Sequence, residues 1–563
     1  MGSKPWLKCY DPHVPEHVEV PRIDLYSQMR PQAVERAHQV ALRFLGTSIT
    51  YSQLHDSIDR LAAGLYALGV RPGDKVSILL PNSPQFIMSY FAILKLGAVA
   101  VLSNPLNVER ELLFKFKDSG SKGLIALDLM SQKINQIKDE LNLDFIIYTG
   151  LKEYIPFPLS LLFSIKIKLD KRVPPIRIQW DDKTYPFQSM LDPKRPAPPD
   201  QEIDPDSLAV LIYSGGTTGV SKGIMLSHFA LVANYLHGVS WVDVQEGDTL
   251  LAVLPLFHGF GMSICMNAPL AMGGTVVLLP RFDAKQVVQT IHKEKPTIFA
   301  GVPTMFIAIK ELFNLKKYDL TSLRGIFVGA APLPLPVMEE FERLTGAALI
   351  EGYGLTEAVT AIACNPLHGK RKPGTVGLPF PDVEWKIVDL EEGTRELAPN
   401  ESGEICLRCP ELMMGYLNQP EATAKTLRNG WLHTGDIGFM DEEGYVTIVD
   451  RLKDLVIVSG FNVFPSEVDE VLHMHPKVAE GVAVGLPHPK KGEYLKAYVV
   501  PRHGETLTPE EIIQFCRENL APFKVPKEVE IRSELPKSVI GKILRRQLKE
   551  EETAKRKNQI KSA

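Results

Sequence analysis

The sequence predicts an α/β protein with a large N-terminal part and a small C-terminal α+β domain. Two stretches, residues 74–128 and 250–300, alternate apolar strands with helical patterns, which is typical of a parallel sheet covered by helices. Residues 374–449 instead form short alternating runs separated by Gly, Asn and Pro, which indicates antiparallel β structure. We therefore expect two α/β sheet subdomains and a β-rich subdomain in residues 1–450, and a separate domain in residues 451–563.

The first α/β stretch contains a buried strand at residues 75–80, a helix at 84–96 and a turn with a strand at 97–102. The second contains strands at 250–253, 273–278 and 297–300, with a helix at 284–292. Strands that are apolar throughout are typical of parallel sheets buried on both faces.

The β-rich part has its clearest strands at residues 384–388 and 445–449. The C-terminal part predicts helices from about Pro465 and Pro509, and strands at 482–484 and 497–500. Its last residues, 549–563, form a charged helix end or tail.

Composition limits the class of function. The 563 residues carry 63 Lys and Arg against 67 Asp and Glu, a net charge of -4, so no basic surplus indicates nucleic-acid binding. Hydrophobic residues at 45% and charged residues at 23% are typical of a folded globular protein rather than a disordered one.

Six scattered cysteines are too few for a disulfide framework. Cys406 and Cys409 form a CxxC, but strand alternation points them to opposite faces, which argues against a metal or redox pair. Residues 1–6 lack an apolar signal segment, and no run reaches the roughly 20 apolar residues of a membrane span. We expect a cytoplasmic protein.

An apolar run followed by basic residues lies between Tyr154 and Lys168. Such a segment either packs its apolar side on the domain or contacts an anionic membrane surface, such as the inner face of the cell membrane. Both interpretations stay open at this stage.

A glycine- and hydroxyl-rich loop follows the apolar run at residues 208–212. Glycines let the backbone approach a phosphate, hydroxyls and amides donate to its oxygens, and a lysine adds a cation. The order differs from the GxxxxGK[ST] of P-loop NTPases, so a different phosphate-binding loop is predicted. Its residues are Ser214, Gly215, Gly216, Thr217, Thr218, Gly219 and Lys222.

This loop resembles the phosphate-binding signature of the adenylate-forming superfamily, which includes acyl-CoA synthetases, luciferases and adenylation domains. Further segments resemble the same family, in the same order and over nearly the whole chain. They are 96–99 with 104–105, 255–258, 329–333, 352–357, 403–405, 434–436, 450–453 and 536–542.

The resemblance implies a nucleotide site for ATP and AMP. Tyr353 would stack on adenine, Asp436 and Arg451 would hold the ribose, and Glu357 with Thr217 would hold Mg²⁺, an ion that prefers oxygen ligands. The remaining positions implied to surround the nucleotide are Gly329, Ala330, Ala331, Gly352, Gly354 and Thr356.

The resemblance also implies catalytic and acyl-binding residues. Lys542 would bridge the reacting carboxylate and the α-phosphate, where a cation stabilises developing charge. Glu357, Thr218 and His258 complete the implied catalytic set. The implied acyl pocket consists of His258, Phe260, Gly261 and Val302.

The implied reaction has two steps, formation of acyl-AMP with release of pyrophosphate and then attack by a thiol. Family members rotate a mobile C-terminal domain between the steps, and Lys453 matches the hinge position. Rotation would bring Ser459, Gly460 and Phe461 to the thiol channel. No insertion interrupts residues 450–465, which favours coenzyme A as the thiol.

For the acid, residues 430–438 resemble fatty acyl-CoA synthetases, which favours a long or medium fatty acid. Residues 257–261 also resemble aryl-CoA ligases, so a hydroxycinnamate-type acid stays an alternative. A luciferase-type oxygenase, a silent lipid-binding relative and a homodimer are further expectations that one sequence leaves open.

Overall fold

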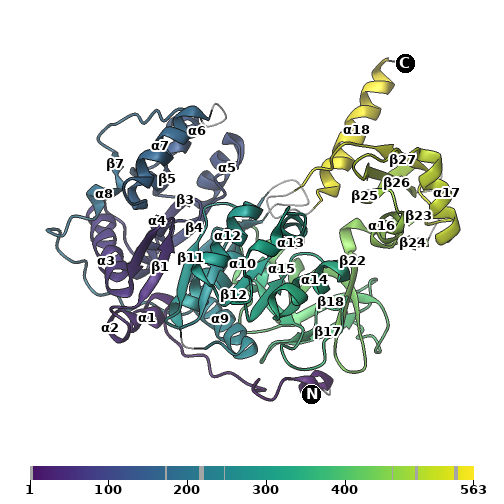
Figure 1. Ribbon diagram of the computed structural model, residues 1–563, viewed down its shortest axis with the longest axis horizontal. Coiled ribbons are helices and arrows are strands. Elements are labelled where there is room, and N and C mark those ends of the chain that lie inside the picture. Colours follow the sequence, from purple (N-terminus) through teal and green to yellow (C-terminus); the bar gives the residue numbers. More distant parts are fainter. Residues whose placement is uncertain are drawn as a thin grey trace.

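The structure is a computed structural model that describes residues 4–170, 174–214, 221–245, 247–458, 461–488, 492–537 and 543–562. A large body contains most of the chain, and a smaller C-terminal lobe lies to its right in Figure 1. Within the described residues, the body holds sheets of nine, eight and five strands and the lobe holds a five-stranded sheet. The predicted mixed α/β class is confirmed.

The eight-stranded sheet contains the first predicted α/β stretch. Its order is β19 (Gly415–Tyr416), β9 (Lys222–Ser227), β8 (Leu208–Ser214), β4 (Val99–Leu102), β3 (Lys75–Leu79), β5 (Gly123–Leu127), β6 (Phe145–Thr149) and β7 (Thr184–Pro186). The strands from β8 to β7 are parallel, and β9 and β19 continue the sheet in antiparallel pairing. Helix α4 (Pro84–Lys95) is buried along almost its whole length, which explains why its sequence is apolar on every side.

The nine-stranded sheet contains the second predicted stretch. Its order is β16 (Leu378–Pro379), β15 (Ala361–Cys364), β14 (Ala348–Gly354), β13 (Gly325–Val328), β12 (Ile298–Gly301), β10 (Thr249–Ala252), β11 (Thr275–Leu278), β1 (Val40–Phe44) and β2 (Thr47–Thr50). Helices α9 (His228–Val242), α12 (Ala284–Glu294), α13 (Pro303–Lys310) and α14 (Leu335–Thr345) connect or cover these strands. Side chains of both sheets belong to one continuous apolar core.

The β-rich part follows as an antiparallel sheet, as its alternating sequence predicts. It consists of β17 (Glu384–Val388), β18 (Gly403–Arg408), β21 (Trp431–Met440), β20 (Leu427–Arg428) and β22 (Val446–Arg451), with α15 (Pro420–Thr426) between β19 and β20. Its last strand, β22, leads directly into the C-terminal lobe (Figure 1).

The C-terminal lobe has an apolar core of its own. Its sheet contains β24 (Phe461–Val463), β23 (Val456–Val458), β26 (Gly492–Pro501), β25 (Val478–His488) and β27 (Glu528–Ile531), covered by α16 (Pro465–Met474) and α17 (Pro509–Asn519). The predicted strands and helices of this part are present. The charged end of the chain is the helix α18 (Arg545–Ser562).

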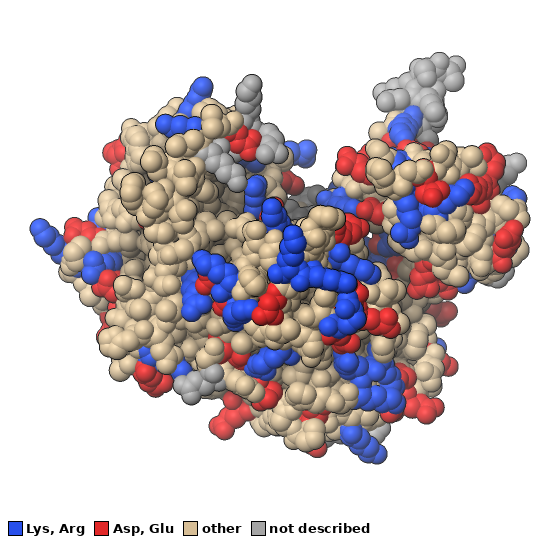
Figure 2. All heavy atoms as spheres, in the orientation of Figure 1, with Lys and Arg blue, Asp and Glu red and all other residues tan. Residues whose placement is uncertain are grey.

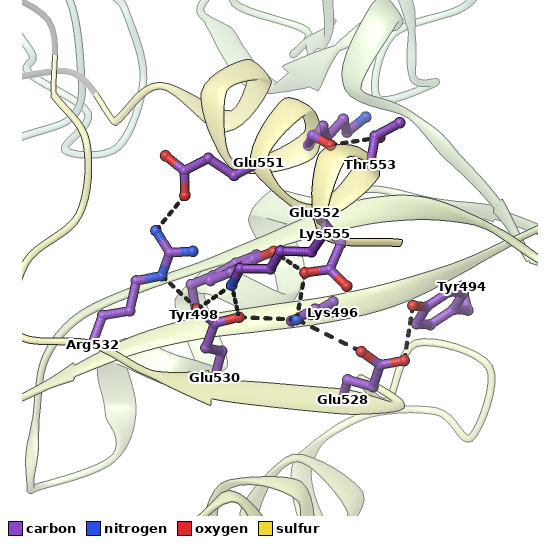
Figure 3. A network of polar contacts seen from close by, with 11 residues as sticks. Tyr494, Lys496, Tyr498, Glu528, Glu530, Arg532, Glu551, Glu552, Thr553 and Lys555 are labelled. Carbon is purple, nitrogen blue, oxygen red and sulfur yellow. Dashed lines mark hydrogen bonds and ion pairs between the residues drawn. The ribbon is translucent and has the colours of Figure 1, made fainter. Parts of the chain in front are cut away.

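Charged side chains attach α18 to the sheet of the lobe (Figure 3). The ammonium of Lys496 on β26 is largely buried and lies 2.8 Å from Glu552 on α18 and 3.0 Å from Glu530 on β27. Arg532 lies 2.8 Å from Glu551 of the same helix. Because these carboxylates pair with cations rather than with water, the start of α18 is held against β26 and β27.

Helix α7 (Leu159–Leu169) lies on the surface and covers most of the apolar-basic segment. Several of its apolar side chains are exposed, among them Leu161 at 54%, Leu162 at 59% and Leu169 at 76%. In the described part of the chain, none of the helices combines the length and apolar character needed to cross a bilayer.

The other helices of the body are α1 (Leu25–Met29), α2 (Gln32–Glu35), α3 (Tyr51–Ala67), α5 (Glu109–Ser119), α6 (Ser131–Ile137), α8 (Phe187–Met190), α10 (Gly259–Met262) and α11 (Ala268–Ala271).

Candidate active site

A cavity of about 780 Å³ opens beside the carboxyl ends of the parallel strands β13 and β14. This edge is where ligands bind in open α/β sheets, because loops that leave the strands converge there. One end of the cavity is polar and is formed by the motif residues Lys222, Tyr353, Glu357, Arg451 and Lys453. The other end is apolar and is formed chiefly by α9 and the residues around α11.

At the polar end, Tyr353, Asp436 and Arg451 form a hydrogen-bonded group. The hydroxyl of Tyr353 donates to Oδ2 of Asp436 over 2.6 Å, and Nε of Arg451 lies 2.9 Å from Oδ1. Asp436 and Arg451 face each other because β21 and β22 pair at these two residues. Burial, and the neighbouring Asp436, raise the pKa of Tyr353, so its hydroxyl remains a neutral donor.

A second set of side chains lies behind Asp436. Glu404 accepts a hydrogen bond from the backbone N–H of Gly435 over 3.0 Å and lies 2.8 Å from Nδ1 of His433. Cys406 lies 3.3 Å from the same nitrogen. These three side chains therefore fix the turn that carries Asp436. Their oxygen, sulfur and nitrogen atoms, which are of types that can bind a metal ion, lie within 4.8 Å of one another.

The two cysteines of the CxxC point to different surroundings, as strand alternation predicts. Cys406 contacts His433, whereas Cys409 lies beside the buried Glu411. Burial raises the pKa of both thiols. The described cysteines are all free.

Glu357 and Lys222 are brought together by a residue that sequence reasoning missed. Tyr416 donates its hydroxyl to Oε1 of Glu357 over 2.9 Å, and the centre of its ring lies 4.4 Å from Nζ of Lys222. Tyr416 lies on a strand of only two residues, β19, so no periodic pattern pointed to it. The one feature of the sequence that could have indicated a role for Tyr416 is that it is an aromatic residue directly after a glycine, Gly415.

The residues around Lys453 join the body to the C-terminal lobe. Lys453 lines the cavity, and burial together with the neighbouring Arg451 lowers its pKa. Asp450 accepts a hydrogen bond from the backbone N–H of Ser466 over 2.9 Å and lies 4.0 Å from Arg545. Polar contacts of Asp450 therefore link β22 to residues of the lobe beside Lys453.

The acyl residues implied by resemblance divide into two groups. His258 and Phe260 line the cavity, and burial lowers the pKa of His258 so that its imidazole is neutral. Gly261 packs against the carbonyl of Pro255, which would lie 2.2 Å from an added Cβ. Val302 is buried before α13, and neither Gly261 nor Val302 is among the residues that line this cavity in the described chain.

The apolar wall comes mainly from residues that no motif indicated. Helix α9 contributes most of it, and the wall continues to Met272, which is partly exposed. Asn234 is fixed in this wall, because its amide donates to the carbonyl of Ala361 over 2.8 Å and its oxygen accepts from Ser263 over 2.6 Å. The contributing residues of α9 are Asn234, Tyr235, Gly238, Val239 and Val242.

Gly329 and Ala330 line the cavity at the end of β13, and Gly352, Gly354 and Thr356 line it at the end of β14, whereas Ala331 is exposed outside it. Several sequence-predicted residues lie outside the described residues: Gly215, Gly216, Thr217, Thr218, Gly219, Lys542, Ser459 and Gly460. The side chains of Ser214 and Phe461 are likewise not described.

The donor set fits a magnesium ion. Glu357 offers a carboxylate at the polar end, and Thr356 adds a hydroxyl in the same wall. Mg²⁺ prefers hard oxygen ligands and usually takes only one or two from the protein, with phosphate oxygens and water completing its shell. The described residues therefore provide the protein ligands that Mg²⁺ bound to a nucleotide would need.

Comparison with known proteins gives consistent matches over nearly the whole chain. Residues 29–417 match the family described as AMP-binding enzyme, and residues 467–542 match AMP-binding enzyme C-terminal domain. The chain is 41% identical to a long-chain-fatty-acid–CoA ligase of Bacillus subtilis, covering 98% of this chain and 99% of that one. It is 35% identical to a feruloyl-CoA synthase of Amycolatopsis, covering 90% and 95%. ATP-bound MatB from Rhodopseudomonas palustris has a similar structure, with a TM-score of 0.83, 29% identity and coverage of 94% and 99%.

Proposed function

The chain belongs to the AMP-binding enzymes, the adenylate-forming ligases, and from this membership we propose the acid it activates and the residues it uses. The family reaction activates a carboxylic acid to acyl-AMP and then forms the coenzyme A thioester, so ATP and coenzyme A are co-substrates. The proposed acid is a long or medium-chain fatty acid.

In the first step the carboxylate oxygen attacks the α-phosphorus of ATP, and the bond to pyrophosphate breaks. We assign Asp436 and Arg451 to the ribose hydroxyls, an assignment that their 2.9 Å contact at the polar end supports, and Lys222, which lines the cavity, to the phosphates. Bound Mg²⁺ supplies charge neutralisation on the phosphates, and Glu357 would hold it. Lys542 is assigned by resemblance to the charge that develops between carboxylate and phosphate.

In the second step the sulfur of coenzyme A attacks the acyl carbon, and the bond to AMP breaks. We assign the carboxyl group of the acid to the neighbourhood of His258, which lines the cavity and whose pKa is lowered by burial. The hinge at Lys453 would let the lobe exchange Lys542 for the loop at Ser459, Gly460 and Phe461. We also propose that the N-terminal domain ends at residue 450 and that the mobile C-terminal domain begins at residue 451.

One observation supports the fatty acid above the others: most of the cavity lining outside the polar end is apolar, from the residues of α9 to Met272, with Gln245 and Asp248 as polar exceptions. A volume of about 780 Å³ is within the range of pockets that enclose a whole ligand. An alkyl chain gains about 0.8 kcal/mol for each buried methylene, so such a wall favours longer chains.

The test is pyrophosphate release from MgATP with acids from acetate to oleate, with and without coenzyme A. The proposal predicts that a long or medium fatty acid gives the highest kcat/KM and that coenzyme A accelerates turnover. Asp436→Asn is the inactive control, because it weakens a charged hydrogen-bond acceptor for the ribose, with an expected loss of about 100-fold. Release by no acid would point to a silent lipid-binding relative, and oxygen uptake with light would point to a luciferase-type reaction.

An aryl acid is the second candidate, favoured by the similarity to a feruloyl-CoA synthase. The polar atoms of Asn234 and Ser263 within the wall could face a ring substituent better than an alkyl chain. Adding ferulate to the same series decides between the two candidates, because only one acid class can have the higher kcat/KM.

We also propose that α7 contacts an anionic lipid surface. Its exposed leucines adjoin Lys168 and, in sequence, Lys171 and Arg172, so apolar insertion and attraction to anionic headgroups coincide. The surface near α7, at the upper left of Figure 2, is largely uncharged with basic side chains beside it. The protein would then be cytoplasmic and peripheral to the inner membrane face.

Flotation with vesicles of phosphatidylglycerol and phosphatidylcholine tests this contact. Leu161→Glu should reduce binding to anionic vesicles, whereas Phe313→Glu, at a residue that is 91% exposed elsewhere, should not. Equal binding of both variants would contradict the proposal. The homodimer expected from resemblance can be measured by light scattering on the same samples.

A further inference from the structure

Tyr416 lies where two separate motifs of the site meet. Its side chain is almost fully buried, at 6% exposure, between Glu357 and Lys222. The family motifs quoted above contain Glu357 and Lys222 but not this tyrosine. The hydroxyl of Tyr416 donates to the carboxylate of Glu357, and its ring faces the ammonium of Lys222.

The backbone holds Tyr416 in a fixed place. Strand β19 pairs with β9 so that Tyr416 faces Ile224, and the N–H of Leu417 donates to the carbonyl of Gly223 over 2.7 Å. Two residues before β19, the N–H of Met413 donates to the backbone carbonyl of Glu357 over 2.8 Å. The same segment is therefore bonded both to the strand that begins at Lys222 and to the turn that carries Glu357.

We propose that Tyr416 is a positioning residue for adenylation, which orients the carboxylate of Glu357 for Mg²⁺. Its hydroxyl occupies Oε1 of Glu357 and so directs the other oxygen to the cation. Its aromatic face also holds the ammonium of Lys222 near the phosphates, through a cation–π contact. This inference depends on the proposed role of Glu357 as the magnesium ligand.

Groups that hydrogen-bond to metal ligands commonly set metal affinity, and their loss costs about 10- to 100-fold. Tyr416→Phe removes the hydroxyl and keeps the ring, so it isolates the contact with Glu357. The chain offers a matched control in the C-terminal lobe, where Tyr494 donates to Oε1 of Glu528 over 2.8 Å (Figure 3). Tyr494→Phe breaks the same kind of bond far from the nucleotide.

The experiment measures Mn²⁺ binding by electron paramagnetic resonance to the full-length protein with the non-hydrolysable analogue α,β-methylene ATP. Pyrophosphate release as a function of free Mg²⁺ is measured in parallel. Tyr416→Phe should weaken Mn²⁺ binding about 10-fold and raise the Mg²⁺ concentration for half-maximal release by the same factor. Tyr494→Phe should leave both quantities within about twofold of wild type.

Wild-type Mn²⁺ affinity in Tyr416→Phe overturns the proposal, even if that variant melts at a lower temperature. Glu357→Gln tests whether Glu357 is the metal ligand at all. If this variant also binds Mn²⁺ with wild-type affinity, the assignment of Glu357 is wrong. If only Glu357→Gln loses affinity, Tyr416 has no positioning role.

Tyr416→Leu tests the second contact, between the ring of Tyr416 and Lys222. This variant is expected to have a higher KM for ATP than Tyr416→Phe, because Lys222 loses its aromatic contact. If Tyr416→Leu does not fold, Tyr416→Met is used in its place.

Discussion

Two glycines that line the cavity, one at each end, differ in how closely their surroundings are packed. At the polar end, a Cβ added to Gly354 would lie 1.8 Å from the carbonyl oxygen of Thr360. At the apolar end, a Cβ added to Gly238 meets no atom within 4 Å. Both glycines line the same cavity, yet one has no room for a methyl group and the other faces open space.

We relate this difference to the ligand proposed for each end. The polar end is set by short hydrogen bonds, such as the 2.6 Å contact between Tyr353 and Asp436, which hold only if the backbone keeps one geometry. An apolar wall gains energy from buried area alone, which depends little on direction. We therefore expect a substitution at Gly354 to be tolerated less well than one at Gly238.

The largest effect is expected for Gly354→Ala. The added methyl group overlaps the carbonyl of Thr360, so the paired strands β14 and β15 must separate beside Tyr353 and Glu357. Displacing reacting groups by about 1 Å typically costs about 100-fold in rate, and pyrophosphate release should fall by at least that factor. Activity close to that of wild type would show that the polar end is less rigid than its packing indicates.

A second test concerns the helix that forms the apolar wall. His237 of α9 is fully buried, with Nδ1 2.6 Å from Glu411 and Nε2 3.4 Å from Asp382. Burial alone would lower the pKa of His237, but Glu411 and Asp382 outweigh it and raise the pKa to about 9. Because this value exceeds the unfolded value of about 6.5, the stabilisation is complete below pH 6.5 and is lost as the pH rises through 9.

The measurement is urea unfolding of wild type and His237→Gln between pH 6 and 10. The stability difference between the two should shrink by about 3 kcal/mol across this range. His55 has the opposite sign, because burial lowers its pKa to about 4; its effect on stability falls between pH 6.5 and 4, below this range, and it is the same in both proteins. A difference that does not vary with pH would mean that His237 is neutral at all these values.

The polar end was largely predictable from the sequence because its residues come from contiguous motifs. The run from Gly352 to Glu357 needs only one strand and one turn to place its side chains in the cavity. The order of strands and helices was predictable for a similar reason, since each element follows from the pattern of about ten residues. The C-terminal helices begin at Pro465 and Pro509, where the proline signal placed them.

The contacts between motifs were not predictable, because they join residues far apart in the chain. Tyr353 and Asp436 are 83 residues apart, and Tyr416 and Glu357 are 59 apart. The apolar wall was missed for another reason. Helix α9 is apolar on nearly every side, so its sequence does not tell which face borders a cavity and which face packs in the core.

A moderate effect is expected for Gly238→Phe, which places a ring in the open space beside α9. The ring should shorten the apolar end, so long acids lose affinity while short acids keep it. Discrimination of about 1 to 3 kcal/mol per excluded group predicts at least a 10-fold fall in the ratio of kcat/KM for palmitate to octanoate. The KM for ATP serves as control and should stay within twofold, because the polar end is unchanged.

The smallest expected effect is a change in stability, and it tests directly whether the space beside Gly238 is open. Gly238→Ala should stabilise the protein by about 0.5 to 1 kcal/mol, because alanine is the better helix former and meets no neighbour. Gly64 in α3 is a matched control, since it too is inside a helix, but its added Cβ would lie 2.8 Å from the carbonyl of Met190. Gly64→Ala should therefore destabilise the protein by about 1 to 3 kcal/mol. Urea unfolding of both variants gives opposite signs if the space beside Gly238 is real. If both lose stability, a side chain or bound molecule occupies that space in solution, and the acyl end is packed as closely as the nucleotide end.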